Sequence, residues 1–286
     1  MGFDVSYHPV KEIEIKEWYF DVLANPDRIF SLGEKYNIDD FYLKKYQDTI
    51  KIAIESNTES SFEVTHGFYI AVVHGFFRTF YYTRGSAFSF LIEEKPYFER
   101  YTKSLNGLIP ETITNPVHHK IVENYSGGVF IPADKVTALL EDYQNNPNVK
   151  ADLNAHFSYK RISVFLNALE DSRKQHAGLL EATEVVEPNP INLNESSCYS
   201  NLFNCDREGP YLYEEAALEQ FRNIEIENNL MPGSLSKKVA FEQMIMPGQE
   251  NESQVIKAES ESQQGAVLPN QPSAKKKGFW NRLFGA

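Results

Sequence analysis

Residues 60–83 read SSFEVTHGFYIAVVHGFFRTFYYT and form the most apolar stretch of the chain. Glu63, His66, His74 and Arg78 interrupt its apolar side chains. A membrane span requires roughly 20 consecutive, predominantly apolar residues, and no uninterrupted run in this stretch approaches that length. We therefore predict a water-soluble helix that is buried in the core of the protein, and no transmembrane span.

One side of this predicted helix lacks large side chains. Gly67, Ala71 and Gly75 recur every four residues, which on a helix leaves a narrow strip with His74 and Arg78 along its edge. One interpretation is tight packing against another backbone, with Arg78 bound to a carboxylate. The alternative is the floor of a pocket, in which His74 is an acid, a base or a ligand and Arg78 binds an anion.

Two further residues complete the candidate catalytic set of His74, Arg78, Glu184 and His8. His8 follows an alternating segment that predicts a strand over Phe3–Tyr7, and it joins the site if that strand runs alongside the central helix. Glu184 shares the inward face of a predicted strand, Leu179–Glu187, with apolar side chains. A carboxylate in that position must be paired or have a raised pKa, although a register shift of one residue would return it to solvent.

The remaining periodicity is mainly helical. Apolar residues at helical spacing predict helices over Glu14–Leu23, Asp27–Tyr36, a segment capped by Asp39 or Asp40, a segment opened by Pro132, Ser158–His176 and Tyr213–Ile226. Alternation predicts strands over Phe3–Tyr7, Ala87–Ile92, 124–131 and Leu179–Glu187. This order predicts an α+β fold, a predominantly helical single domain with a small sheet.

Composition changes sharply near residue 247. Residues 1–246 hold 23 basic and 36 acidic side chains, a net charge of −13, and we expect them to form the globular body. Residues 247–274 are rich in Gln, Ser, Glu, Asn and Pro, which predicts a disordered linker. An acidic body repels phosphate backbones, so we expect a protein partner of basic character and no nucleic acid.

Residues 275–286 form a basic, aromatic terminal peptide. A helical conformation would gather large apolar side chains on one side, behind a run of lysines, and such peptides bind partner grooves or anionic membrane surfaces. The alternative is a solubilised chain end that docks on the acidic body of its own chain. Membrane contact by so short a segment would be weak. The predicted docking residues are Lys275, Lys276, Lys277, Phe279, Trp280, Arg282, Leu283 and Phe284.

No metal or cofactor is predicted. Adjacent His118 and His119 point in different directions on any regular element, and Cys198 and Cys205 lack zinc-knuckle spacing. A site assembled from these residues with His156 is the weaker alternative to buried structural thiols. Two cysteines and no secretory signal at the N-terminus indicate a reducing compartment, the cytoplasm.

No common catalytic motif occurs: GxSxG, HExxH, GxGxxG and the phosphate loop are all missing from the sequence. The acidic, motif-free chain is similar in kind to bacterial immunity and accessory proteins, a resemblance of composition that rests on no alignable motif. Our leading hypothesis is a cytoplasmic protein-interaction module with an acidic body and a terminal docking peptide. An enzyme, or a small-ligand or metal binder, that uses a pocket beside the Gly67, Ala71 and Gly75 strip is the alternative.

Overall fold

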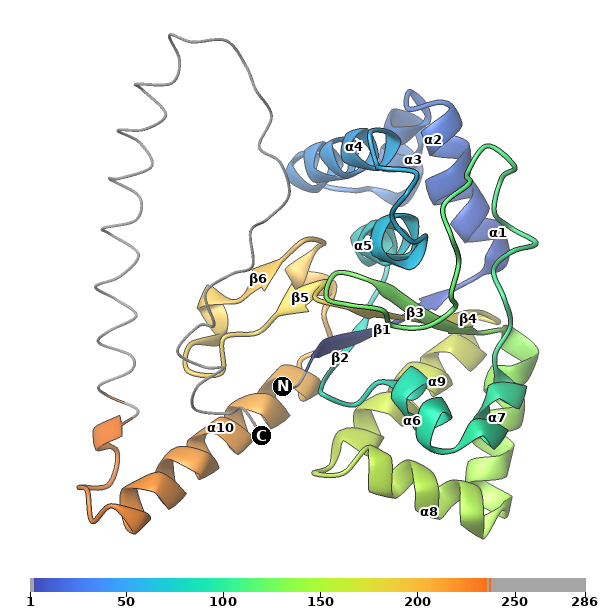
Figure 1. Ribbon diagram of the computed structural model, residues 1–286. Helices are drawn as coiled ribbons and strands as arrows, with labels where there is room; N and C mark the ends of the chain where they lie inside the picture. The colour runs from blue at the N-terminus through green and yellow to red at the C-terminus, as the bar shows by residue number, and fades with distance from the viewer. Residues whose placement is uncertain (1–2, 236, 238–286) are drawn as a thin grey trace, which may run out of the picture. The chain divides into compact units, whose positions relative to one another are not determined.

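The structure is a computed structural model that describes residues 3–235 and 237 (Figure 1). The predicted linker and terminal peptide, residues 247–286, lie outside the described residues. The chain divides into a larger unit, residues 2–189 and 193–213, and a smaller unit, which contains residues 190–192 and the chain from Glu214 onward.

A four-stranded antiparallel sheet lies at the centre of the larger unit. Its strands are β1 (Asp4–Val10), β2 (Tyr81–Arg84), β3 (Gly127–Ile131) and β4 (Gly178–Thr183), in the order β2-β1-β4-β3. In the register, Tyr7 lies opposite Glu181 and His8 opposite Leu180. A short ribbon of β5 (Val186–Glu187) and β6 (Ser197–Cys198) follows β4 in the chain.

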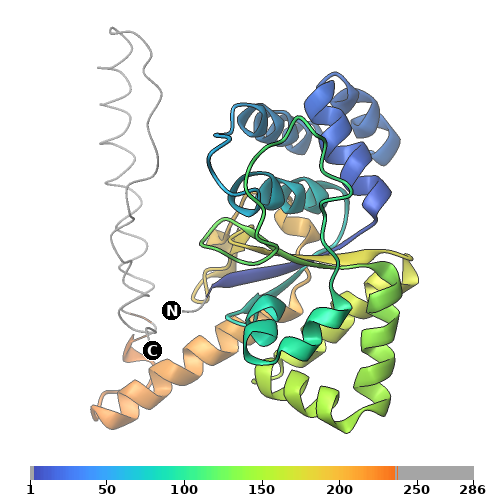
Figure 2. The same cartoon turned by 45° about the vertical axis from the view of Figure 1, so that its right-hand side comes forward.

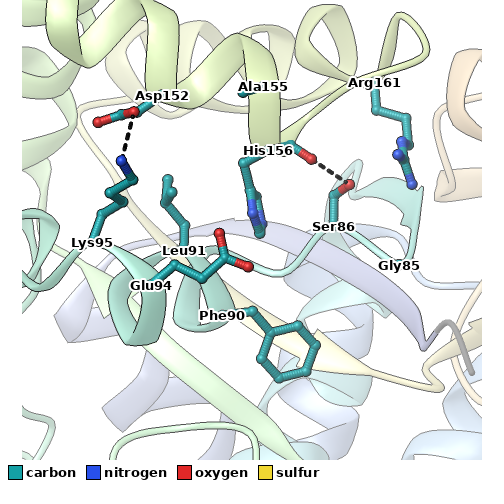
Figure 3. Close-up of a pocket in the computed structure, with 10 residues that line it drawn as sticks. All are labelled: Gly85, Ser86, Phe90, Leu91, Glu94, Lys95, Asp152, Ala155, His156 and Arg161. Atoms are coloured by element: carbon teal, nitrogen blue, oxygen red, sulfur yellow. Dashed lines mark hydrogen bonds and ion pairs between the residues drawn. The ribbon is translucent and has the colours of Figure 1, made fainter.

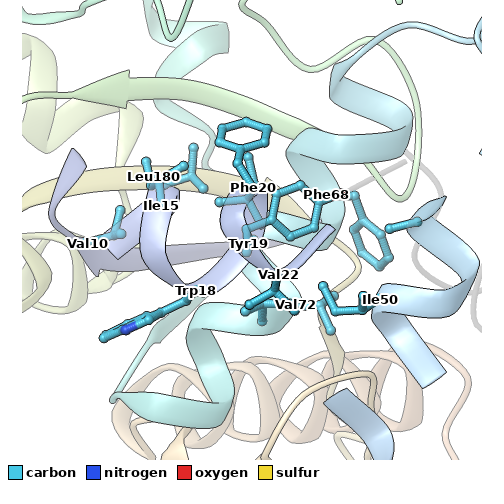
Figure 4. Close-up of a cluster of buried hydrophobic side chains, with 14 of the residues drawn as sticks. Val10, Ile15, Trp18, Tyr19, Phe20, Val22, Ile50, Phe68, Val72 and Leu180 are labelled. Carbon is cyan, nitrogen blue, oxygen red and sulfur yellow. The ribbon is translucent and has the colours of Figure 1, made fainter. Parts of the chain in front are cut away.

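Helices cover both faces of this sheet (Figures 1 and 2). Val10, Phe130 and Leu180 pack on one face, as part of the core shown in Figure 4. This first layer comprises α1 (Glu12–Ile15), the π-helical η1 (Lys16–Phe20), α2 (Asp21–Ala24), α3 (Arg28–Tyr36), α4 (Asp40–Ile54), the π-helical η2 (Glu63–Gly67) and α5 (Phe68–Phe77). Since large aromatic side chains bury much apolar area, Trp18, Tyr19 and Phe20 stabilise this layer strongly.

The second layer packs on the opposite face through Val5, Tyr7 and Leu179. It comprises α6 (Phe88–Glu94), the 3₁₀ helix η3 (Pro96–Tyr101), α7 (Ala133–Asn145), α8 (Pro147–His156) and α9 (Arg161–Lys174). Because helices bury both faces, β3 carries apolar side chains at the successive positions Val129, Phe130 and Ile131, whereas β1 alternates and buries the polar side chains of Ser6 and His8.

The predicted α+β class, mainly helical with a small sheet, is confirmed. The helices predicted over Asp27–Tyr36 and after Asp39 are confirmed, and the Asp39 carboxylate accepts the backbone N–H of Phe41 as an N-cap should. The helix predicted over Ser158–His176 is present from Arg161 to Lys174.

One predicted element is too long and another is wrong. The central helix predicted over residues 60–83 is present over Glu63–Phe77 but ends there, and Tyr81–Arg84 is strand β2. The strand predicted over Ala87–Ile92 is helix α6 instead. Tertiary contacts decide this second case, because the Tyr7 hydroxyl and the Glu181 carboxylate accept the backbone N–H groups of the first turn of α6.

Helix α10 (Glu208–Glu227) begins in the larger unit and continues into the smaller one. Beyond its end, the Glu225 carboxylate accepts the backbone N–H groups of Gly233 and Leu235 at 2.7 and 2.8 Å, which fixes the turn that follows the helix. None of the helices in the described part of the chain has the length and apolar character needed to cross a bilayer.

Candidate functional site

His8 and His74 are neighbours in the interior of the larger unit, between β1 and α5. Each is about 1% exposed. The His8 ring stacks on Phe80 at 5.0 Å, and the His74 ring contacts Trp18 at 5.0 Å. The two predicted histidines therefore come together, as the pocket hypothesis requires.

Each of these imidazoles uses only one of its nitrogens. His8 Nε2 lies 2.9 Å from Ser6 Oγ, and His74 Nδ1 donates to the Ile70 carbonyl at 2.7 Å. His8 Nδ1 and His74 Nε2 are buried and have no hydrogen-bond partner among the described residues. Buried polar atoms without partners are uncommon, so these two nitrogens could accept or donate a hydrogen bond that the described residues do not supply.

Burial, together with the nearby His74, lowers the pKa of His8 to about 3. Burial likewise lowers the pKa of His74 to about 3. Both rings are neutral at physiological pH and are weak bases there, since an efficient general base has a pKa near the working pH. Neutral rings can still accept or donate a hydrogen bond to a small guest.

Arg78 also contacts Trp18. Its guanidinium forms an ion pair with Glu14, donates to Gln175 Oε1 at 2.6 Å and lies 5.2 Å from the Trp18 ring. Arg78 is thus bound to a carboxylate, as the packing interpretation expects, although it shares Trp18 with His74.

Protein atoms occupy the small-residue strip at both of its glycines. A Cβ on Gly67 would lie 3.4 Å from the Cα of Gly127, and a Cβ on Gly75 would collide with Ser200. Ser200 also donates to the Val72 carbonyl at 2.7 Å. The expected pocket floor is therefore a packing surface at these positions, because a strand and a loop lie directly on the helix backbone.

Glu184 lies in a different place from the histidines. The predicted strand breaks there, because Glu184 has φ 59° and links β4 to β5. Its side chain is buried and accepts the Asp4 backbone N–H at 3.3 Å. Burial, together with the negative charge of Asp4, raises the pKa of Glu184 to about 8. The sequence predicted that the Glu184 side chain points inward. It does so because of the turn between β4 and β5 and not because of its position on a strand.

We expect Glu184→Gln to stabilise the protein at alkaline pH. A carboxyl whose pKa rises from 4.5 to about 8 on folding contributes its full stability below pH 4.5, and loses it as pH rises through 8. Chemical denaturation at pH 8 should therefore show a gain of about 4 kcal/mol for the variant, with no gain at pH 4. An equal effect at both pH values would mean that the glutamate and glutamine proteins differ in stability because of packing and not because of ionisation.

A second buried carboxylate, Glu181, was not predicted. It accepts backbone N–H groups of Ser89 at 3.2 Å and Val129 at 3.3 Å, and burial raises its pKa. Gly128 has no room for a side chain because this carboxylate occupies the space. The sequence signal was an acidic residue, Glu181, within the apolar run of β4. This signal indicates a buried carboxylate only if both faces of the sheet are known to be covered.

Two surface cavities flank helix α6. One, of about 450 Å³, is lined by residues of α6 and the α8–α9 connection, including Ser86, Phe90, Glu94, His156 and Arg161 (Figure 3). The other, of about 410 Å³, lies on the opposite side and includes His118 and His119. Neither cavity is lined by the predicted catalytic residues.

The two adjacent histidines of the second cavity are held through their backbone. The Glu63 carboxylate accepts the N–H groups of both His118 and His119, and His119 Nε2 lies 2.9 Å from Ser104 Oγ. Burial raises the pKa of Cys198 to about 11 and also raises that of Cys205, so both thiols are poor ligands and nucleophiles. Within residues 3–235 and 237, no three His, Cys, Asp or Glu side chains are grouped to hold a metal.

Sequence patterns gave no indication of Arg161 as a site residue, and they indicated His156 only as a weak candidate metal ligand. Both flank a turn with two successive positive φ values, at Tyr159 (54°) and Lys160 (64°), and non-glycine residues carry no reliable signal for that conformation. Comparison of the chain with models of known protein families, with curated protein sequences and with solved structures found no match.

Proposed function

We propose that the protein is an interaction module of the cytoplasm that binds a basic protein partner. Helix α10 carries the observation that supports this proposal. Its twenty residues include six glutamates and a single arginine. Acidic surfaces attract basic partners over distance and accelerate their association, whereas they repel nucleic acid.

The C-terminal end of α10 also exposes aliphatic side chains. Ile226 is 74% exposed, and Leu230 and Met231, just beyond the helix, are 44% and 80% exposed. The chain turns back after the helix because Asn229 has φ 52° and Leu230 N–H donates to the Glu225 carbonyl at 2.8 Å. Apolar side chains rimmed by charge are typical of protein-interaction surfaces.

Replacing Ile226, Leu230 and Met231 by serine together is expected to abolish capture of the partner. Anchoring apolar residues of interfaces each contribute more than about 1 kcal/mol, so retention on the immobilised chain should fall at least about tenfold. The measurement is quantitative capture from a cell lysate at low and at physiological salt. Higher salt should also weaken capture by the unchanged chain, because screening reduces charge attraction.

The matched control replaces Phe41, Ile52 and Ile54 of α4 by serine, since these side chains are similarly exposed at 65%, 53% and 52%. It should leave capture unchanged. If both triple variants retain the same proteins as the unchanged chain, the end of α10 is not the interaction surface.

The terminal peptide belongs to the same proposal. Deletion of residues 275–286 should remove one interaction, either with the partner or with vesicles that contain anionic lipid, because lysines beside aromatic residues suit both. Vesicle flotation distinguishes binding to lipid from binding to the protein partner. Capture and flotation that do not change after deletion would argue against a docking role for this peptide.

A second candidate, an enzyme or a binder of a small ligand or metal, is favoured by one observation. The buried rings of His8 and His74 are close enough to interact, and each has one nitrogen without a partner among the described residues. Metal analysis of the purified protein tests the metal form of this candidate, and stoichiometric zinc or iron that His74→Asn removes would favour it over the interaction module.

A further inference from the structure

Arg161 is a partly buried cation without an anionic partner. Its guanidinium donates to the Ser158 carbonyl and hydroxyl, each at 2.9 Å, and to the Arg84 carbonyl. A guanidinium has five N–H donors, so two of them have no acceptor among the described residues. Burial lowers the pKa of Arg161, since neutral acceptors compensate its lost hydration only in part.

Other partly buried arginines of the larger unit are neutralised. Arg78 pairs with Glu14, and Arg84 pairs with Asp4 at 2.7 Å. This fold therefore places a carboxylate opposite a partly buried guanidinium elsewhere. No carboxylate among the described residues pairs with Arg161, and this side chain lines the cavity beside α6.

The backbone that presents Arg161 is strained. Tyr159 and Lys160 both adopt positive φ, a conformation that costs on the order of 1 kcal/mol or more for each such residue. This turn ends α8 and starts α9, so that His156 and Arg161 line the same cavity. Strain of this kind persists where the surrounding structure holds a functional group in place.

The other end of the cavity offers acceptors. His156 Nε2 donates to the Ala87 carbonyl at 2.7 Å, and burial lowers the pKa of this ring, so its Nδ1 is an acceptor at neutral pH. The Glu94 carboxylate is exposed and has no hydrogen bond or ion pair with the described residues. Figure 3 shows it extending towards the His156 ring, above the Phe90 side chain.

We propose that the cavity beside α6 binds a small zwitterion of amino-acid size, with its carboxylate on Arg161 and its ammonium group on Glu94. Planar guanidinium groups match carboxylates in geometry, and the free Glu94 oxygens accept ammonium N–H groups. Phe90 and Leu91 supply apolar contact for a side chain. The volume, about 450 Å³, lies within the range of small-ligand sites.

The charge pattern favours this ligand over a simple anion. Glu94 and Asp152 line the same cavity together with Arg161 and with Lys95, which pairs with Asp152 at 3.3 Å. These four side chains carry no net charge, so the cavity favours a ligand without net charge over a phosphate or a dicarboxylate. A cation without a carboxylate would leave Arg161 unpaired. Only a molecule with both charges satisfies the two ends of the site.

Calorimetric titration of the full chain tests the proposal with four probes: phenylalanine, 3-phenylpropionate, 2-phenylethylamine and inorganic phosphate. Phenylalanine should bind best, 3-phenylpropionate more weakly, and the amine and phosphate least. Arg161→Gln should weaken phenylalanine binding by on the order of tenfold to a hundredfold, the effect of losing a charge-assisted hydrogen-bonded pair. Glu94→Gln should weaken the binding of phenylalanine but leave that of 3-phenylpropionate unchanged.

Arg173→Gln is the matched control, because Arg173 lies on the same helix and pairs on the surface with Glu170. It should change nothing. Circular dichroism verifies folding of Arg161→Gln, and Glu94→Gln tests the site independently, since Glu94 has no structural partner. Absence of phenylalanine binding at millimolar concentration, equal binding by the Arg161 variant, or preference for phosphate would each overturn the proposal.

Discussion

Acidification from pH 7 to pH 4 is expected to lower the free energy of unfolding by about 3 kcal/mol for each of His8 and His74. The folded protein holds both rings neutral, with pKa values near 3, whereas the unfolded chain protonates them below pH 6.5. A histidine with a lowered pKa leaves stability unaffected above pH 6.5. Stability then falls as pH decreases from 6.5 towards 3, because only the unfolded state binds the proton.

Two substitutions isolate this effect. His8→Gln and His74→Asn each retain a polar atom near the nitrogen that is hydrogen-bonded now, to Ser6 and to Ile70, but neither replacement titrates. Denaturant unfolding of the double variant at pH 7, 5.5 and 4 should show a much smaller loss of stability on acidification. Carboxylates contribute equally to both proteins, so they cancel in the comparison.

His118→Gln provides the control, since His118 is exposed and its side chain has no structural role in the core. Its acid profile should match that of the unchanged protein. If the free energy of unfolding falls equally with pH for the double variant and the unchanged protein, protonation of His8 and His74 does not destabilise the folded state.

Gly127→Ala is expected to cost on the order of 3 kcal/mol, because it overpacks the contact between strand β3 and the start of the central helix. A Cβ on Gly127 would lie 2.8 Å from the carbonyl carbon and 2.9 Å from the Cα of Gly67. Both are backbone atoms, which cannot rotate away as a side chain does. The helix must therefore shift off the sheet, and its buried contacts with the core loosen.

Gly67→Ala, the same change on the other side of this contact, is the matched control. Its Cβ would lie 3.4 Å from the nearest atoms, and alanine favours helix by up to about 1 kcal/mol over glycine. Thermal and denaturant unfolding should show little net change for Gly67→Ala and a large loss for Gly127→Ala. Similar losses for both would mean that the two backbones are not as close as the structure places them.

Sequence periodicity alone determined much of the architecture. The helical spacing after Asp39 and after Ser158 predicts helices that the structure contains, and the apolar character of residues 60–83 predicts the buried helix that ends at Phe77. These elements follow from local propensity and from one buried face, both of which can be read along the chain. The acidic charge of the body is likewise a property of composition.

Three further features of the fold and of the candidate sites depend on tertiary contacts. Phe88–Glu94 is helical because a tyrosine hydroxyl and a buried carboxylate, distant in sequence, accept its first N–H groups. The strip of small residues is filled because β3 and Ser200 lie on it. The Arg161 cavity depends on two positive φ values at residues whose type does not indicate them. Each of these features depends on partners far apart along the chain, and local sequence patterns carry no information about such contacts.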